Sequence, residues 1–72
     1  MARYIVNSNE YDGHHEVHNT TVHCDNSTYP KPENQVDLGE QPNCSTAIAV
    51  AERMQPGWQI DGCAYCTNCH KR

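Results

Sequence analysis

The sequence has few of the residues that normally build a hydrophobic core. It contains no phenylalanine, and leucine, isoleucine and valine together number nine in 72 residues. A share this low is typical of chains that do not fold by apolar burial alone. Chains of this length bury only about 60% of their unfolded surface, and small ones commonly add a cross-link or a metal. We therefore expect a second source of stability in this protein.

Long apolar runs are missing as well. No stretch is long enough to cross a membrane, and residues 1–7 carry no apolar run of the kind found in secretion signals. We therefore expect a cytoplasmic protein with no membrane contact. A cytoplasmic chain keeps its thiols reduced, which favours a metal over a disulfide as the cross-link and leaves the disulfide as the alternative.

Positive charge is also scarce, since five Lys and Arg stand against nine Asp and Glu for a formal net charge of −4. The basic residues are scattered, apart from the last two: Arg3, Lys31, Arg53, Lys71 and Arg72. Affinity for nucleic acid depends on clustered cations that displace counterions from the phosphates. The charge pattern therefore disfavours a nucleic-acid partner.

Cysteine and histidine, in contrast, are abundant, with five of each. Residues 63–70 read Cys-Ala-Tyr-Cys-Thr-Asn-Cys-His and contain two overlapping C-x-x-C pairs. Such a pair directs two thiolates at one ion and supplies half of a tetrahedral zinc site. The other half must come from residues 14–24, which hold four histidines and one cysteine. Zinc binding of about 10–16 kcal/mol would then become folding energy for a single zinc-binding domain over residues 1–72.

Other chemistries match the same residues less well. Cys66, Cys69 and His70 fit the C-x-x-C-H haem attachment pattern, but the chain lacks the apolar residues of a haem pocket. The run His14-His15-Glu16-Val17-His18 differs from the H-E-x-x-H metalloprotease motif in its spacing. In an extended strand, His14, Glu16 and His18 share one face, and we expect a solvated polar edge for all but one of them. No enzyme activity is predicted.

Hydrophobic patterning predicts strands over residues 3–7 and 35–38, the latter ended by Gly39, and an extended segment over 14–24. No regular element is expected over residues 62–72. The predicted fold is a small zinc-stapled α+β domain of the ββα type, with two or three short strands and one helix.

The helix is expected over residues 44–55, capped by Asn43 and ended by the following Pro-Gly. One apolar stripe runs along it: Cys44, Ala47, Ile48, Ala51 and Met54. This position makes Cys44 a small buried core residue rather than a metal ligand.

The order of these motifs resembles that of a family of small uncharacterised bacterial proteins, over residues 4–70. The shared features are H-E-V-H followed by a cysteine, N-x-V-x-L-G, a cysteine before an Ala-rich helix, and D-G-C-x-Y-C with C-H behind. More remotely, the layout is similar to the zinc-binding module of Ada-type DNA repair proteins. This resemblance implies a zinc site, without the repair chemistry, made by His18, Cys24, Cys63 and Cys66. The spacing leaves His23, Cys69 and His70 as alternative ligands.

Four tyrosines and Trp58 are many aromatic residues for so few aliphatic ones. Aromatic side chains are enriched at the hot spots of protein interfaces. We therefore expect a non-enzymatic, zinc-stabilised module that binds a protein partner. The alternatives are a metal- or redox-handling Cys/His protein and a nucleic-acid-associated zinc module. Trp58 and Tyr65 are also explained if they cover the helix and the metal.

Overall fold

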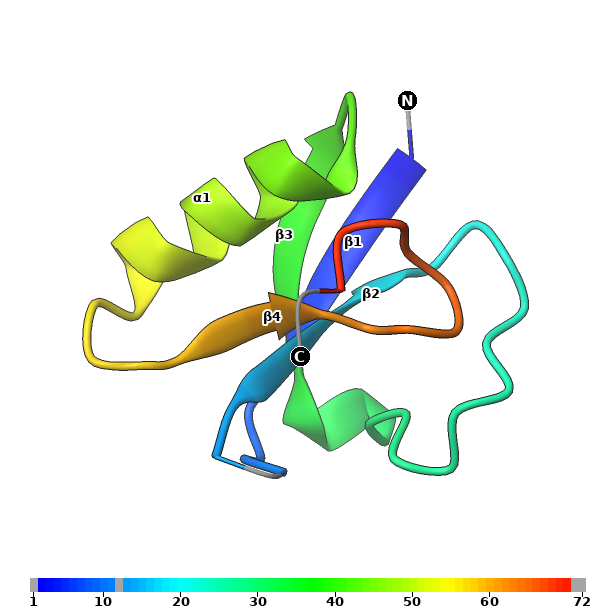
Figure 1. Cartoon of the computed structure of the whole chain (residues 1–72), viewed down its shortest axis with the longest axis horizontal. Coiled ribbons are helices and arrows are strands. Elements are labelled where there is room, and N and C mark those ends of the chain that lie inside the picture. Colours follow the sequence, from blue (N-terminus) through cyan, green and yellow to red (C-terminus); the bar gives the residue numbers. More distant parts are fainter. Residues whose placement is uncertain (1, 12, 71–72) are drawn as a thin grey trace.

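The computed structural model describes residues 2–11 and 13–70, which form one β-sheet with a helix across one face (Figure 1). In chain order the elements are β1 (Ala2–Asn7), β2 (His15–Asn19), the 3-10 turn η1 (Pro32–Asn34), β3 (Gln35–Gln41), α1 (Cys44–Met54) and β4 (Ile60–Gly62). The mixed α+β class is confirmed, with four strands in place of two or three. The basic pair Lys71 and Arg72 lies outside the described residues.

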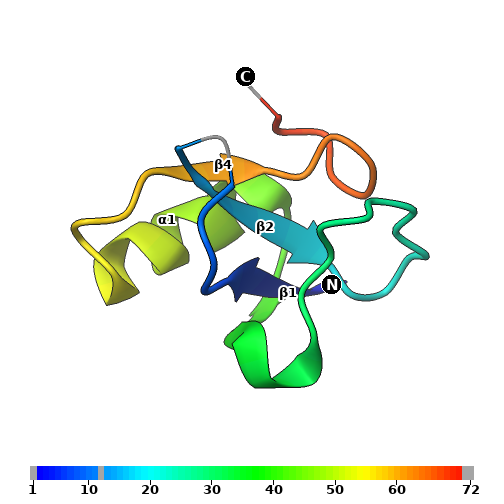
Figure 2. The same ribbon diagram turned by 90° about the horizontal axis from the view of Figure 1, so that it is seen from below.

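The strands follow one another across the sheet in the order β3-β1-β2-β4. β1 pairs antiparallel with both β2 and β3, whereas β4 pairs parallel with β2. Parallel neighbours need a crossover connection. Here α1 lies on the path from β3 to β4, and it covers one face of the sheet on the way (Figures 1 and 2).

The core fills the space between the sheet and α1. Val6 and Val17 lie opposite each other in the β1–β2 pair and are fully buried. The whole buried cluster is Tyr4, Val6, Val17, Leu38, Cys44, Ala47 and Ala51. Small helix residues let α1 approach the strands closely, so a thin core suffices for this face.

The helix begins and ends close to the predicted residues. The side chain of Asn43 accepts a hydrogen bond from the backbone N–H of Thr46 at 2.9 Å and caps the first turn. The predicted stripe is buried at Cys44, Ala47 and Ala51. The prediction is wrong at Met54, which is 48% exposed. Met54 is the last residue of α1, where the chain turns away towards β4.

Two strand predictions need correction. Gly39 does not end β3, which continues to Gln41. Gly39 has a φ of 73°, a conformation that glycine adopts without strain, and the pairing with β1 shifts register beside it, between Tyr4 and Ile5. β4 was not predicted. It is only three residues long and exists through its pairing with β2.

The face opposite α1 is covered by two segments that contain no helix or strand, residues 20–31 and 63–70. Figure 2 shows these segments side by side at one end of the sheet. Side chains of a β-strand alternate between the two faces of the sheet. In β2, Val17 therefore points to the helix side, whereas Glu16 and His18 point to the face opposite α1. Among the described residues, no helix is both long and apolar enough to pass through a membrane.

Candidate metal centre

Four potential metal ligands converge where these two segments meet the sheet. His18 comes from β2, Cys24 from the segment 20–31, and Cys63 and Cys66 from the segment that follows β4. One donor atom of each lies within 4.8 Å of all the others. The Nδ1 atom of His18 is 3.7 Å from Cys24 Sγ and 3.6 Å from Cys66 Sγ, and the sulfurs of Cys24 and Cys63 are 3.7 Å apart.

These separations match the edges of a zinc coordination tetrahedron. Zinc lies about 2.3 Å from a cysteine sulfur and about 2.0–2.1 Å from a histidine nitrogen. A tetrahedron with these radii has edges of about 3.8 Å between two sulfurs and about 3.5 Å between sulfur and nitrogen. These three distances differ from the tetrahedral edges by no more than about 0.2 Å, and the other three pairs of donor atoms lie within 4.8 Å of each other. The four donor atoms can therefore hold one metal ion.

His18 is held in place by the sheet. It is fully buried, it lies opposite Ile5 in the β1–β2 pair, and the ring of Tyr29 meets its imidazole edge-on at 4.9 Å. Burial lowers the pKa of His18, although the charge of Glu16 works against this effect. A neutral imidazole carries the free lone pair that a metal needs.

A tight turn positions the two cysteines of the C-x-x-C pair. The backbone N–H of Cys63 donates to the Val17 carbonyl at 2.9 Å, which continues the β2–β4 pairing by one residue. The backbone N–H of Thr67 then returns to the Cys63 carbonyl at 3.1 Å and closes the turn around Cys66. The hydroxyl of Thr67 donates to the same carbonyl at 2.6 Å. Both thiols therefore point to the same place.

The three thiols differ in their electrostatic surroundings. Burial raises the pKa of Cys24 and of Cys66. Burial acts in the same direction on Cys63, but hydrogen bonds from the Asn26 side chain at 3.3 Å and the Tyr65 backbone at 3.4 Å outweigh it and lower its pKa. A divalent cation reverses the cost of burial, because it favours the thiolate at every ligand it touches. The donor set suits metal binding.

The alternative ligands lie outside this cluster. The side chain of His23 is 87% exposed and pairs with Asp25 at 2.8 Å. His70 lies with its Nδ1 2.9 Å from the Gly62 carbonyl. Cys69 forms a disulfide with Cys44.

This disulfide corrects one expectation. Cys44 is buried in the core of the helix face, as predicted, but it is cross-linked to Cys69 and is not an isolated core thiol. Metal and disulfide had been weighed as alternatives, whereas the structure contains a disulfide and a separate cluster able to hold a metal. The odd number of cysteines was the signal for this combination in the sequence, because five cysteines divide into three metal ligands and one disulfide pair.

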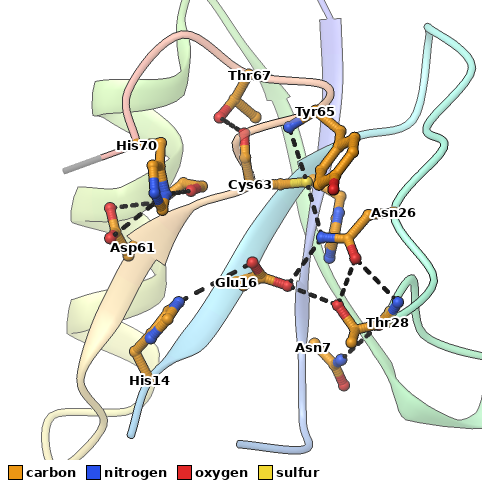
Figure 3. A network of polar contacts seen from close by, with 12 residues as sticks. Asn7, His14, Glu16, Asn26, Thr28, Asp61, Cys63, Tyr65, Thr67 and His70 are labelled. Atoms are coloured by element: carbon orange, nitrogen blue, oxygen red, sulfur yellow. Dashed lines mark hydrogen bonds and ion pairs between the residues drawn. The ribbon is translucent and has the colours of Figure 1, made fainter. Parts of the chain in front are cut away.

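A polar network extends from the cluster along the same face of β2 (Figure 3). Glu16 Oε1 accepts hydrogen bonds from the Thr28 hydroxyl at 2.9 Å and from Asn26 Nδ2 at 3.3 Å. His14 is only 5% exposed, so the expected solvated edge is wrong for this residue. Sequence reasoning missed Asn26 and Thr28. Their signal was the Asn-Ser-Thr turn, in which Asn26 Oδ1 accepts from the Thr28 backbone at 2.9 Å.

Comparison of this chain with protein-family models, with curated proteins and with solved structures finds no match. The resemblance to small bacterial proteins and to the Ada-type module stays a prediction. The metal centre is therefore argued from its own geometry.

Proposed function

We propose that this protein is a small zinc-stabilised, non-enzymatic module in which His18, Cys24, Cys63 and Cys66 bind one zinc ion. The convergence of the four donor atoms, three of whose separations match tetrahedral edges, supports this proposal. A catalytic zinc keeps one position for water or substrate, whereas a structural zinc has four protein ligands. Here the protein supplies four donors, and the site is therefore assigned a structural role.

The cluster lies where the fold has the least other support. The segments 20–31 and 63–70 contain no helix or strand, and the apolar cluster of the protein lies on the other face of the sheet. Zinc bound by both segments and by β2 closes the loop between residues 24 and 63. The free energy of binding, about 10–16 kcal/mol for comparable structural sites, then stabilises the folded chain.

Metal analysis of the purified protein tests the proposal, followed by replacement of zinc with cobalt. We expect about one zinc per chain, and a cobalt spectrum typical of tetrahedral coordination by three thiolates and one imidazole. Removal of the metal with a strong chelator should abolish the cooperative thermal transition seen by far-UV circular dichroism. A metal-free chain that melts with an unchanged cooperative transition would contradict the proposal.

We propose that this module binds a protein partner in the cell. Fewer aromatic side chains are available for such a contact than the sequence suggested. Tyr4 is buried in the core, and Trp58 stacks on His15 with ring centroids 3.9 Å apart. Tyr11 and Tyr65 remain exposed, at 41% and 66%, and both line one pocket. Two tyrosines at a single pocket support a local contact site.

Metal handling is the second candidate function, and one observation favours it. Cys24 is the only half-buried residue among the four proposed ligands, and it lines a shallow pocket with Val22, His23 and Tyr29. A ligand that solvent reaches is where a competing thiol attacks first. Exchange of bound zinc with an isotopically labelled pool separates the two uses, since a structural site exchanges slowly and a handling site exchanges readily.

A further inference from the structure

A cavity of about 440 Å³ lies beside the proposed metal centre, on the face of the sheet opposite α1. Its lining includes Tyr11, His14, Glu16, Thr28, Tyr65 and His70. Residues from β2, from both irregular segments and from the loop before β2 meet here, and Figure 3 shows the polar contacts around it. The proposed zinc site uses none of these six side chains.

The carboxylate of Glu16 is the central charged group of this cavity. Its side chain is only 12% exposed. Thr28 and Asn26 both donate to Oε1, which fixes the orientation of the carboxylate. The other oxygen, Oε2, lies 3.9 Å from Nε2 of His14, too far for a hydrogen bond. An oriented, largely buried carboxylate therefore keeps acceptor capacity for a donor that enters the cavity.

Within residues 2–11 and 13–70, the surroundings of this carboxylate contain a further carboxylate and no Lys or Arg. Asp61 of β4 is paired in register with Glu16 and is 3% exposed. Its Oδ2 lies 3.7 Å from Nδ1 of His70, the atom that also faces the Gly62 carbonyl. No Lys or Arg among the residues that the structure describes lines this cavity. The protein as a whole carries a formal charge of −4.

Two exposed tyrosines also line the cavity. Tyr11 precedes β2 and Tyr65 follows β4, so the rings belong to distant parts of the chain. Aromatic faces attract organic cations and pack against their alkyl chains. A carboxylate in a cavity that exposed tyrosines also line is chemistry suited to a cation with an apolar stem.

We propose that this cavity binds an alkylammonium group, with the ammonium donating to Glu16 Oε2 and the alkyl chain lying between Tyr11 and Tyr65. The source of the group is either a free amine or the side chain of a lysine in a peptide. In the second case, the cavity is the contact site for the protein partner proposed above.

The cavity and the metal centre share two residues, and in this respect the inference rests on the proposed function. Asn26 Nδ2 lies 3.3 Å from both Glu16 Oε1 and Cys63 Sγ. The backbone N–H of Tyr65 donates to the same sulfur at 3.4 Å. Asn26 and Tyr65 thus connect the cavity to the proposed ligand Cys63. By linkage, an amine bound in the cavity should raise the equilibrium affinity for zinc.

The test is a titration of ¹⁵N-labelled full-length protein, as purified and with its zinc content measured, followed by NMR. The probe is butylammonium chloride, and the controls are butanol and sodium chloride at matching concentrations. We expect saturable shifts of the Asn26 side-chain amide and of the Thr28 and Tyr65 backbone amides, at roughly millimolar concentration for so small a ligand. Neither control should produce them.

Two matched variants test the role of the carboxylate. Glu16→Gln keeps an oxygen that can accept from Thr28 and Asn26 but loses the charge, so butylammonium should bind about tenfold more weakly, as expected when a charged hydrogen-bond partner is lost. Glu52→Gln removes the same charge from the exposed side of α1 and should bind as the wild type does. Zinc content, measured for each variant, reports whether the metal centre is intact.

Several results would overturn the inference. These are the absence of saturable shifts in the wild type, equal shifts with butanol, or unchanged binding by Glu16→Gln. If Glu16→Gln does not fold, Tyr65→Ala replaces it, because loss of one ring that lines the cavity should also weaken binding. A chain that purifies without zinc contradicts the metal proposal, while the titration still decides the amine site.

Capped peptides distinguish the two sources of the amine. Acetyl-Gly-Lys-Gly-amide is compared with the same peptide carrying norleucine in place of lysine. Tighter binding of the lysine peptide than of butylammonium supports a protein partner. Weaker binding of the peptide supports a free amine, and the proposed chemistry of the cavity holds in both cases.

Discussion

The two faces of the sheet are stabilised by different interactions. On the side of α1, seven buried residues pack into one apolar cluster, and the disulfide from Cys44 to Cys69 joins the helix to the chain end. On the other side, the buried groups are mainly polar side chains and thiols, with Ile5 as an apolar exception: Ile5, Asn7, His14, His18, Asp61, Cys63 and Cys66. Polar groups are stable in such a place only when they are paired or bound to a cation. The comparison shows that apolar packing stabilises one face, whereas the other face depends on ligand chemistry.

Strand alternation creates this division. Val17 points to the helix and lies between Glu16 and His18, which point the other way, so adjacent residues of one strand contribute to both faces. A change on one face should therefore leave the other face intact. This independence is what the following experiments examine, beginning with the largest expected effect.

Cys63→Ala should have the largest effect. The change removes one of three thiolate ligands together with the acceptor used by Asn26 and by the Tyr65 backbone. Since structural zinc contributes about 10–16 kcal/mol, we expect loss of the metal and of cooperative unfolding. Zinc analysis and far-UV circular dichroism provide the measurements. A Cys63→Ala protein that keeps a full equivalent of zinc and a normal transition would show that the polar face does not depend on this ligand.

The pH dependence of stability should identify thiolate coordination. With zinc bound, three thiols are deprotonated in the folded state, whereas they are protonated in the unfolded chain below about pH 8.5. The unfolded state then binds about three more protons than the folded state. The free energy of unfolding of the protein therefore rises by about 4 kcal/mol per pH unit at constant free zinc. The lowered pKa of His18 acts in the same direction. The stability that the neutral imidazole contributes to the folded state is present above about pH 6.5 and is lost as the pH falls below that value.

Urea unfolding at several pH values between about 6.5 and 8.5, in a zinc buffer, measures this slope. Burial without a metal predicts the opposite sign. The raised pKa values of Cys24 and Cys66 keep these two thiols protonated in the folded state, so they make stability fall as the pH rises and the unfolded thiols ionise, and the lowered pKa of Cys63 offsets only one of them. A flat or falling profile would therefore contradict zinc–thiolate coordination.

Removal of the disulfide, which joins the start of α1 to the segment that contains Cys63 and Cys66, should have an intermediate effect. Cys44 and Cys69 are 25 residues apart, and the loop-entropy relation gives about 3.5 kcal/mol for a closed loop of that length. The double variant Cys44→Ala/Cys69→Ala should lose about this much free energy of unfolding in urea and should keep its zinc. It also serves as the matched control for Cys63→Ala. Loss of zinc in the double variant would show that the two faces are coupled.

The smallest effect is expected at the start of the helix. Asn43→Ala removes the acceptor of the Thr46 backbone N–H and should cost about 1 kcal/mol. Asn43→Asp keeps an acceptor at the cap and should cost less. Urea unfolding of the zinc-bound variants measures both differences. A change in zinc content in either variant would contradict the independence of the two faces.

The helix could be predicted because its signals are local. The Asn43 cap, the spacing of Cys44, Ala47 and Ala51, and the proline after Gln55 all lie within one continuous segment. β4 could not be predicted in the same way. Ile60–Gly62 becomes a strand only because it pairs with His15–Val17, more than forty residues earlier in the sequence.

The candidate ligands divide in the same way, into those that local sequence predicts and those that depend on the tertiary structure. The C-x-x-C spacing identified Cys63 and Cys66 as a possible pair, because a tight turn alone brings two such thiols together. The position of His18 within β2 decides between it and His23. His18 is the last but one residue of a central strand and is fully buried, whereas His23 lies beyond the end of that strand and is exposed.

By itself, the sequence determined that so few aliphatic residues require a further stabilising element, that residues after Asn43 form a helix, and that Glu16 and His18 face away from Val17. Helix capping and strand alternation depend on residues that are neighbours in the sequence, and composition does not depend on contacts at all. Only the tertiary structure decided that Cys69 bonds to Cys44, and that a carboxylate-lined cavity forms beside the metal centre. These contacts join segments that are distant in sequence, and their formation depends on how the sheet pairs and how both loops close over it.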